Sequence, residues 1–142
     1  MITNEQISNA EHVDFEDLKG LTITKVEMLI SDAKWQKNYD NQINQVLLTM
    51  SDGSRYLLYH EQDCCEDVYL EQIIGYPEHL IGSEILEAKT ESDEFGDMGD
   101  DVTELTFHHV KTAKGTVVFK WNGSSNGYYN MGVWQVKLRE AE

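Results

Sequence analysis

The chain has 142 residues, enough for a single domain whose core needs neither disulfides nor metals to hold it. It carries 26 acidic residues against 11 Lys and Arg, and the formal net charge of −15 opposes direct binding to a nucleic-acid backbone. The sequence contains no run of 18 apolar residues and no basic segment leading into one, so we predict no membrane contact and a cytoplasmic location.

The first half of the chain predicts a capped helical turn, a strand and a hairpin. A glycine at Gly20 ends the helical turn, and a β-branched run follows it. Asp52-Gly53 between two apolar runs is the strongest short hairpin signal. The expected order is a lead-in or short helix (1–14), a helical turn (14–20), a strand (21–30), a polar connection (31–43) and two hairpin strands (45–51 and 55–59).

The second half repeats this order of signals. A strand (68–74) ends the first half, and the second half then has a helical turn (77–80), a strand beginning at 85–89, an acidic loop (91–101), two hairpin strands (103–111 and 116–121) and a last strand (132–138). Gly20 corresponds to Gly82 and Gly53 to Gly115, since 82 − 20 and 115 − 53 both give 62. We therefore predict one α+β domain over residues 1–142, predominantly antiparallel β, built from two pseudo-symmetric β-meander halves at 15–73 and 77–138.

Residues 59–70 concentrate the reactive side chains of the chain. His60, Cys64 and Cys65 could bind zinc with Asp63 or Glu66, but adjacent cysteines rarely share one ion and no second ligand pair follows. We therefore predict no metal site and no cofactor. A disulfide between neighbouring cysteines is unfavourable, so reduced thiols are expected, with one cysteine facing the core and the other facing out.

Catalysis by this stretch is disfavoured. A thiolate needs positive charge nearby, whereas the cysteines stand among acids, so no catalytic residue is assigned. The carboxylates of Glu61, Asp63 and Glu66 could act as an acid–base pair or bind a hard cation. A solvated loop in which Asp63 caps backbone amides is the alternative that the high acid content favours.

The loop at the equivalent place in the second half offers a different chemistry. Aromatic rings interleaved with amides and hydroxyls suit sugars, nucleobases or a protein epitope, although an ordinary Asn-Gly turn explains part of the pattern. The 62-residue offset matches this loop with residues 60–66, so the candidate ligand-binding residues come from both. They are His60, Gln62, Asp63, Trp121, Asn122, Ser124, Ser125, Asn126, Tyr128 and Tyr129.

Two motifs carry a resemblance to a known group of proteins. The run His60-Glu61-Gln62-Asp63-Cys64-Cys65-Glu66, with Ser124-Ser125-Asn126-Gly127-Tyr128-Tyr129, resembles a family of small uncharacterised phage and bacterial proteins. The resemblance covers about residues 55–138. It implies a phage or prophage origin, and a place in the host cytoplasm, but no activity, cofactor or catalytic residue.

Three functions are compatible with the sequence. The leading hypothesis is a non-enzymatic, homo-oligomeric phage protein that counteracts a bacterial defence by binding a nucleotide-derived immune signal or a defence protein. The high negative charge favours an alternative, an acidic mimic of nucleic acid that inhibits a DNA-handling host enzyme. A metal-dependent hydrolase built on Glu61, Asp63 or Glu66 is the third.

Overall fold

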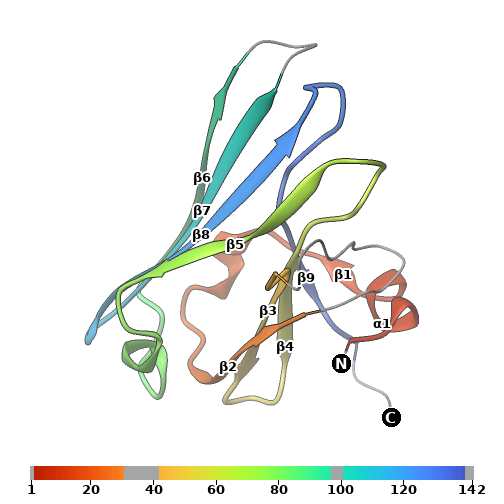
Figure 1. Cartoon of the computed structure of the whole chain (residues 1–142). Helices are drawn as coiled ribbons and strands as arrows, with labels where there is room; N and C mark the ends of the chain where they lie inside the picture. The colour runs from red at the N-terminus through yellow and green to blue at the C-terminus, as the bar shows by residue number, and fades with distance from the viewer. Residues whose placement is uncertain (1, 31–41, 97–100, 140–142) are drawn as a thin grey trace.

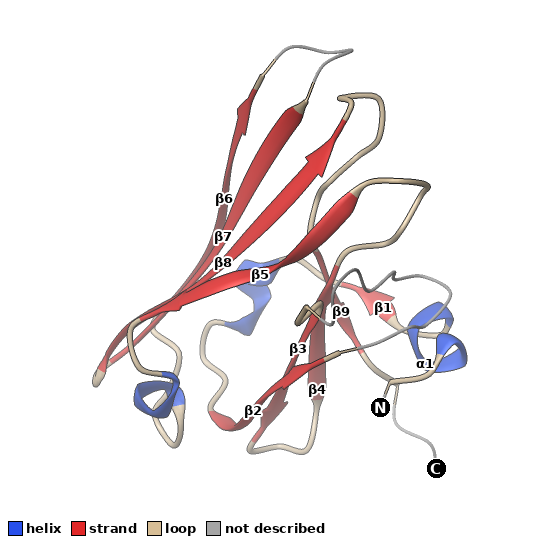
Figure 2. Cartoon of the chain, in the orientation of Figure 1, coloured by secondary structure: helices blue, strands red, loops and turns tan. Residues whose placement is uncertain are grey.

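Strands dominate the fold, and its helices are short (Figure 2). The computed structural model describes residues 2–30, 42–96 and 101–139; most of the polar connection expected at 31–43 therefore lies outside the described residues. The helical segments are α1 (Asn4–Ser8), η1 (Phe15–Leu18) and η2 (Pro77–Leu80). Both helical turns expected before the two meanders are thus present. None of the helices in the described ranges has the length and apolar character of a membrane span.

Five strands form the first sheet, in the order β1-β9-β4-β3-β2, and each pair of neighbours is antiparallel. Strands β3 and β4 form the hairpin predicted at Asp52-Gly53, where Gly53 has a φ of 89° that suits glycine. The bounds are β1 (Glu11–His12), β2 (Ile23–Leu29), β3 (Gln45–Met50), β4 (Arg55–Tyr59) and β9 (Trp134–Lys137).

Four strands form the second sheet, in the order β5-β8-β7-β6, again with antiparallel neighbours. The bounds are β5 (Asp67–Ile74), β6 (Glu87–Phe95), β7 (Val102–Thr112) and β8 (Gly115–Ser125). The far ends of β6, β7 and β8 reach beyond the first sheet (Figure 1), and residues 90–96 are all exposed. The prediction of a predominantly antiparallel β fold is confirmed.

The acidic loop expected at 91–101 is in part a strand. Residues 91–95 continue β6 and pair with β7 through Phe95, opposite Thr103. Strand β8 likewise runs on to Ser125, so the loop expected at 122–129 begins four residues later than predicted. Both strands are longer than predicted because their ends pair along β7, a contact that no local pattern of apolar residues records.

The chain crosses from one sheet to the other at two places. Residues 60–66 lead from β4 in the first sheet to β5 in the second, and residues 126–133 lead from β8 back to β9. Because β4 pairs with β9 and β5 pairs with β8, both connections begin and end on neighbouring strands. The fold therefore brings the two connections together, and we call them the first and second crossover.

Two apolar clusters hold the sheets in place. The larger draws on both sheets and on η1 and η2, and it includes Leu48, Leu58, Val117, Phe119 and Trp121. The smaller packs α1 against the first sheet and contains Ile2, Ile7, Leu47, Leu57, Tyr59, Val136 and Leu138. Since side chains of a strand alternate between its two faces, β3 and β4 contribute to both clusters and are buried on both sides.

Candidate functional site

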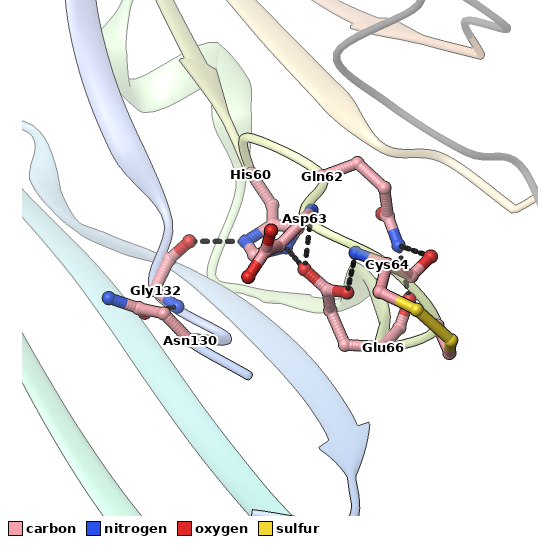
Figure 3. A network of polar contacts seen from close by, with 8 residues as sticks. His60, Gln62, Asp63, Cys64, Glu66, Asn130 and Gly132 are labelled. Carbon is pink, nitrogen blue, oxygen red and sulfur yellow. Dashed lines mark hydrogen bonds and ion pairs between the residues drawn. A yellow bond between two sulfur atoms is a disulfide. The ribbon is translucent and has the colours of Figure 1, made fainter. Parts of the chain in front are cut away.

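His60 joins the two crossovers (Figure 3). Its ring Nδ1 lies 2.6 Å from the Gly132 carbonyl oxygen on the second crossover, and its Nε2 lies 2.7 Å from Glu66 Oε2 at the end of the first. The residue is 2% exposed, so these contacts are shielded from water. The two connections are therefore fixed to each other by one buried side chain.

Glu66 is the acceptor at the centre of this network. The residue is 0% exposed; its Oε2 also accepts the Asp63 N–H at 2.9 Å, and its Oε1 accepts the Cys64 N–H at 2.8 Å. Burial alone would raise the pKa of the Glu66 carboxyl, but the amide hydrogen bonds and the bond to His60 outweigh it and lower the pKa. Both oxygens are engaged by the protein, which leaves this carboxylate poorly placed for acid–base or metal chemistry.

Both ring nitrogens of His60 face acceptors. A carbonyl oxygen only accepts, so the bond to Gly132 requires a hydrogen on Nδ1; an ionised carboxylate also only accepts, so the bond to Glu66 requires one on Nε2. A pair of this kind is stable in a buried site only when its remaining polar groups are also hydrogen-bonded, as those of Glu66 are.

The first crossover is closed by two further contacts. Gln62 Nε2 donates to the Glu66 carbonyl at 2.6 Å and to the Cys64 carbonyl at 3.2 Å. Cys64 and Cys65 are joined by a disulfide, which corrects the expectation of reduced thiols. The disulfide and the hydrogen bonds of Gln62 and Glu66 thus act on the same four residues, 63–66.

A hollow of about 340 Å³ opens beside this network. His60, Glu61, Gln62 and Asp63 line it from the first crossover. Asn130 and Trp134 line it from the second crossover and the first residue of β9. The Trp134 side chain is large and apolar, yet the residue is 39% exposed. Residues of both crossovers thus share one surface with an accessible aromatic ring.

Two more hollows adjoin the first along β9. The second, of about 320 Å³, shares Trp134 with the first, and the third, of about 370 Å³, shares Asp14 and Gln135 with the second. We call the three together the β9 groove. The further lining residues are His12, Val13, Asp17, Phe15, Glu16 and Thr90. Five carboxylates line the β9 groove, and in the described part of the chain no lysine or arginine does.

The negative charge continues onto the second sheet. Glu104 on β7 stands directly opposite Glu94 on β6, in the part of the sheet that reaches beyond the first. Burial raises the pKa of Glu104, the charge of Glu94 raises it further, and the charge of His60 opposes the rise. A nearby cation would stabilise the ionised form of a carboxyl whose pKa is raised in this way.

The structure brings only part of the predicted site together. His60, Gln62 and Asp63 line the β9 groove, whereas Trp121 is 1% exposed and belongs to the core rather than to a recognition surface. Asn122 lies within β8 and its Nδ2 donates to Glu71 Oε1 at 3.3 Å across the sheet. Alternation along β8 sends neighbouring residues to opposite faces, so these side chains could not form one surface.

The remaining predicted residues are not among those that line the β9 groove. Ser124 is an exposed strand residue paired with Asp67 and Thr103. Ser125 Oγ accepts the Gly127 N–H at 3.0 Å, and Asn126 Oδ1 accepts the Tyr128 N–H at 3.0 Å. These are the contacts of an ordinary Asn-Gly turn, the alternative to a recognition surface. Tyr128 is 66% exposed, and Tyr129 is half-buried.

Two residues of the site were missed by sequence reasoning. Asn130 Oδ1 accepts the Gly132 N–H at 2.6 Å and so holds the second crossover in position beside His60. Trp134 alternates with Gln135 and shares its strand face with Val136, a pattern that indicated an ordinary strand residue. Trp134 is the first residue of β9 and follows the second crossover directly. This position at the end of a strand accounts for its exposure, which the alternation of residues along the strand did not indicate.

Metal-ligand geometry does not occur in the described ranges, where no three His, Cys, Asp or Glu side chains converge as ligands would. His108 and His109 point to opposite faces, as expected for neighbours in a strand. His108 is fully buried, its Nε2 lies 3.3 Å from Gln135 Oε1, and its ring meets Phe15 edge-on at 4.6 Å between centroids. Burial lowers the pKa of His108 to about 4, so the ring is neutral at pH 7.

Comparison with known proteins gives one match. A family model described as a domain of unknown function, DUF7448, matches residues 16–134. The matched range begins within η1, ends at the first residue of β9 and includes both crossovers. No curated protein and no solved structure matches the chain. Because the family model covers well over half of its length, the chain belongs to the DUF7448 family.

Proposed function

We propose that this chain is a non-enzymatic binding protein of phage or prophage origin that counteracts a bacterial anti-phage defence. Its target is a defence protein, which it binds at a positively charged surface through the β9 groove. The observation that carries the proposal is the groove itself, which five carboxylates line; four of them, Asp14, Asp17, Glu61 and Asp63, line the two hollows that the accessible ring of Trp134 also lines. Exposed aromatic rings are common anchors of protein interfaces.

The charge of the β9 groove supports a defence protein over a nucleotide-derived signal as the target. A nucleotide-derived signal carries phosphates, and a like charge 4 Å away costs on the order of 4 kcal/mol at an effective dielectric constant of 20. Asp63, Glu61 and their neighbours would repel such a ligand, and among the described residues of the lining there is no lysine or arginine to offset them. A lysine or arginine of a partner protein would instead be attracted to these carboxylates by a comparable energy, and its cation can also stack on Trp134.

The pair of Glu94 and Glu104 supports the same partner. Two carboxylates directly opposite each other in a sheet destabilise it. A basic side chain placed between them would remove the repulsion and lower the raised pKa of Glu104. A cationic partner would therefore relieve this repulsion.

A second candidate function uses the same charge on a larger scale. The exposed half of β6, which reaches beyond the first sheet, carries Glu91 and Asp93 on one face and Glu94 on the other. An acidic projection of this kind suits a mimic of nucleic acid that occupies the basic groove of a DNA-handling host enzyme. Binding by such a mimic depends on these strand acids and weakens steeply with salt, whereas binding through Trp134 retains an apolar part.

An infection assay separates the two. The chain is expressed in bacteria that carry a defence against phage, and plaque formation is compared with that in cells that lack the chain. We expect a groove variant, Glu61→Gln with Asp63→Asn and Trp134→Ala, to lose the restored plaques and the co-purifying partner. The matched control, Glu91→Gln with Asp93→Asn, should behave as the wild type.

The opposite pattern would favour the nucleic-acid mimic. Equal restoration by wild type and groove variant would refute a role for the β9 groove. The homo-oligomeric state expected from the sequence stays a prediction, which sedimentation equilibrium of the purified protein tests.

We also propose that the chain arose by duplication of a unit now present at 15–73 and 77–138. The Gly20 N–H donates to the Ile85 carbonyl at 2.9 Å, and the Gly82 N–H donates to the Ile23 carbonyl at 2.9 Å. Donors and acceptors are both 62 residues apart, since 82 − 20 and 85 − 23 give that number. Each meander also receives its fourth strand, β9 or β5, from the other half. An experimental structure whose two halves do not superpose would contradict the proposal.

A further inference from the structure

The two cysteines of the first crossover have no part in the binding function proposed for the β9 groove. We infer that the Cys64–Cys65 disulfide is a redox-active site, which exchanges with small thiols of the glutathione class and thereby switches the first crossover between two conformations. The inference is independent of the proposed partner and holds whether or not the β9 groove binds one.

The disulfide stands where the hydrogen bonds of the crossover converge. The Cys64 N–H donates to Glu66 Oε1 at 2.8 Å, and the Cys64 carbonyl accepts Gln62 Nε2 at 3.2 Å. The bond closes a small ring around the one peptide that joins Cys64 to Cys65, so the backbone dihedrals of both residues are restricted together. Opening the ring releases those dihedrals, and both hydrogen bonds of Cys64 depend on them.

A reductant can reach this bond. Cys65 is exposed and Cys64 is half-buried, in contrast to the fully buried Glu66 next to them. Thiol–disulfide exchange requires that the attacking sulfur approach one sulfur of the bond, and exposed disulfides are the ones that act in regulation. Because its two residues are neighbours, the bond does not connect distant parts of the chain. Its reduction therefore removes no long-range constraint from the fold.

The exchange consumes two thiols and produces one disulfide. A thiolate of the reductant attacks Sγ of Cys65, the bond between the two cysteine sulfurs breaks, and Cys64 leaves as a thiolate that takes up a proton. A second thiolate attacks the sulfur of the reductant in this mixed disulfide, and Cys65 leaves and is protonated. The two cysteines gain two electrons and two protons, and the reductant is oxidised to its own disulfide.

The switch acts on the β9 groove through adjacent residues. Gln62 and Asp63 line the groove and precede the cysteines directly; the Asp63 N–H also binds Glu66 Oε2. In the oxidised form the hydrogen bonds to Glu66 and from Gln62 hold these side chains in the conformation described above. In the reduced form the Cys64 amide is free to leave Glu66, and the position of Asp63 changes with it.

Mass spectrometry tests whether the disulfide forms. The full chain is purified without reductant, treated with iodoacetamide, and compared with a sample first incubated with glutathione in excess. We expect no label before reduction and a label on each of Cys64 and Cys65 afterwards. Labelling of both thiols in the unreduced protein would overturn the inference.

Hydrogen exchange tests whether the bond is a switch. We expect reduction of the wild type to accelerate exchange of the Cys64 amide about tenfold, since local opening sets that rate. The variant Cys64→Ser with Cys65→Ser should show one rate with and without glutathione. Equal rates in oxidised and reduced wild type would overturn the inference, and this comparison does not depend on how the variant folds.

Discussion

Replacing Glu66 with glutamine removes the acceptor that holds both crossovers. The carboxylate accepts N–H groups from His60 at 2.7 Å, from Asp63 at 2.9 Å and from Cys64 at 2.8 Å. A glutamine side chain has the same shape but offers one oxygen, and its NH₂ group would face a buried N–H donor. At least one of the three donors therefore loses its partner.

The cost follows from burial. An unpaired buried donor costs about 1–3 kcal/mol, and removing one member of a buried ion pair costs about 3–5 kcal/mol because the other charge stays behind. Glu66 is 0% exposed, so water cannot replace the lost carboxylate. We expect Glu66→Gln to lower the free energy of unfolding by about 3–5 kcal/mol, a large part of the total for a domain of this size.

Urea unfolding followed by circular dichroism measures the change. The matched control is Glu61→Gln, which removes the same charge from an exposed position of the same crossover and should change the free energy of unfolding by less than about 0.5 kcal/mol. A loss of less than about 1 kcal/mol for Glu66→Gln, or a loss equal to that of Glu61→Gln, would refute the reasoning.

Three further predictions concern other parts of the fold. His108 has a folded pKa of about 4, below its unfolded value of 6.5, so the unfolded chain binds more protons and stability should fall by about 3 kcal/mol between pH 7 and pH 4; His108→Gln should remove this part of the pH dependence of urea unfolding. Burial and the charge of Glu94 raise the pKa of Glu104, so the folded chain binds more protons than the unfolded chain and the ionised carboxyl destabilises the fold at pH 7. Glu104→Gln should therefore stabilise the protein at pH 7 by about 0.5–1 kcal/mol, and a gain that persists well below pH 4.5 would contradict the ionised carboxylate as its cause. Gly123→Ala places a Cβ 2.9 Å from the Met131 Cβ on the second crossover and should cost about 1–3 kcal/mol in thermal unfolding, and an unchanged midpoint would show that the crossover yields freely.

The hairpins of this fold could be predicted because their signals are local. Asp52-Gly53 and Gly115 mark turns by residue type alone, and the structure places hairpins at both. The strand at 91–95 could not be predicted in the same way. Neither face of it is buried, so its sequence lacks the apolar alternation that identifies a strand, and pairing with β7 alone defines it.

The candidate site could be predicted only in part, for a similar reason. The 62-residue offset pointed to two equivalent loops, and the contact between them is a bond from His60 to Gly132, which are 72 residues apart. That bond depends on which strands pair, so no local pattern contains it. The disulfide between Cys64 and Cys65 was not predicted because the expectation of reduced thiols came from a general rule about adjacent cysteines, which takes no account of the contacts that Glu66 makes around them.

The most direct test is a titration of the ¹⁵N-labelled protein by nuclear magnetic resonance with an arginine hexapeptide and, separately, with a cyclic dinucleotide. Trp121 is buried and Trp134 accessible, so their indole signals provide an internal comparison. We expect the peptide to shift the resonances of the Trp134 indole and of the Asp63 and Asn130 amides together, and the dinucleotide to shift none of them. Shifts caused by the dinucleotide, or peptide shifts confined to one crossover, would contradict a single acidic groove built by both crossovers.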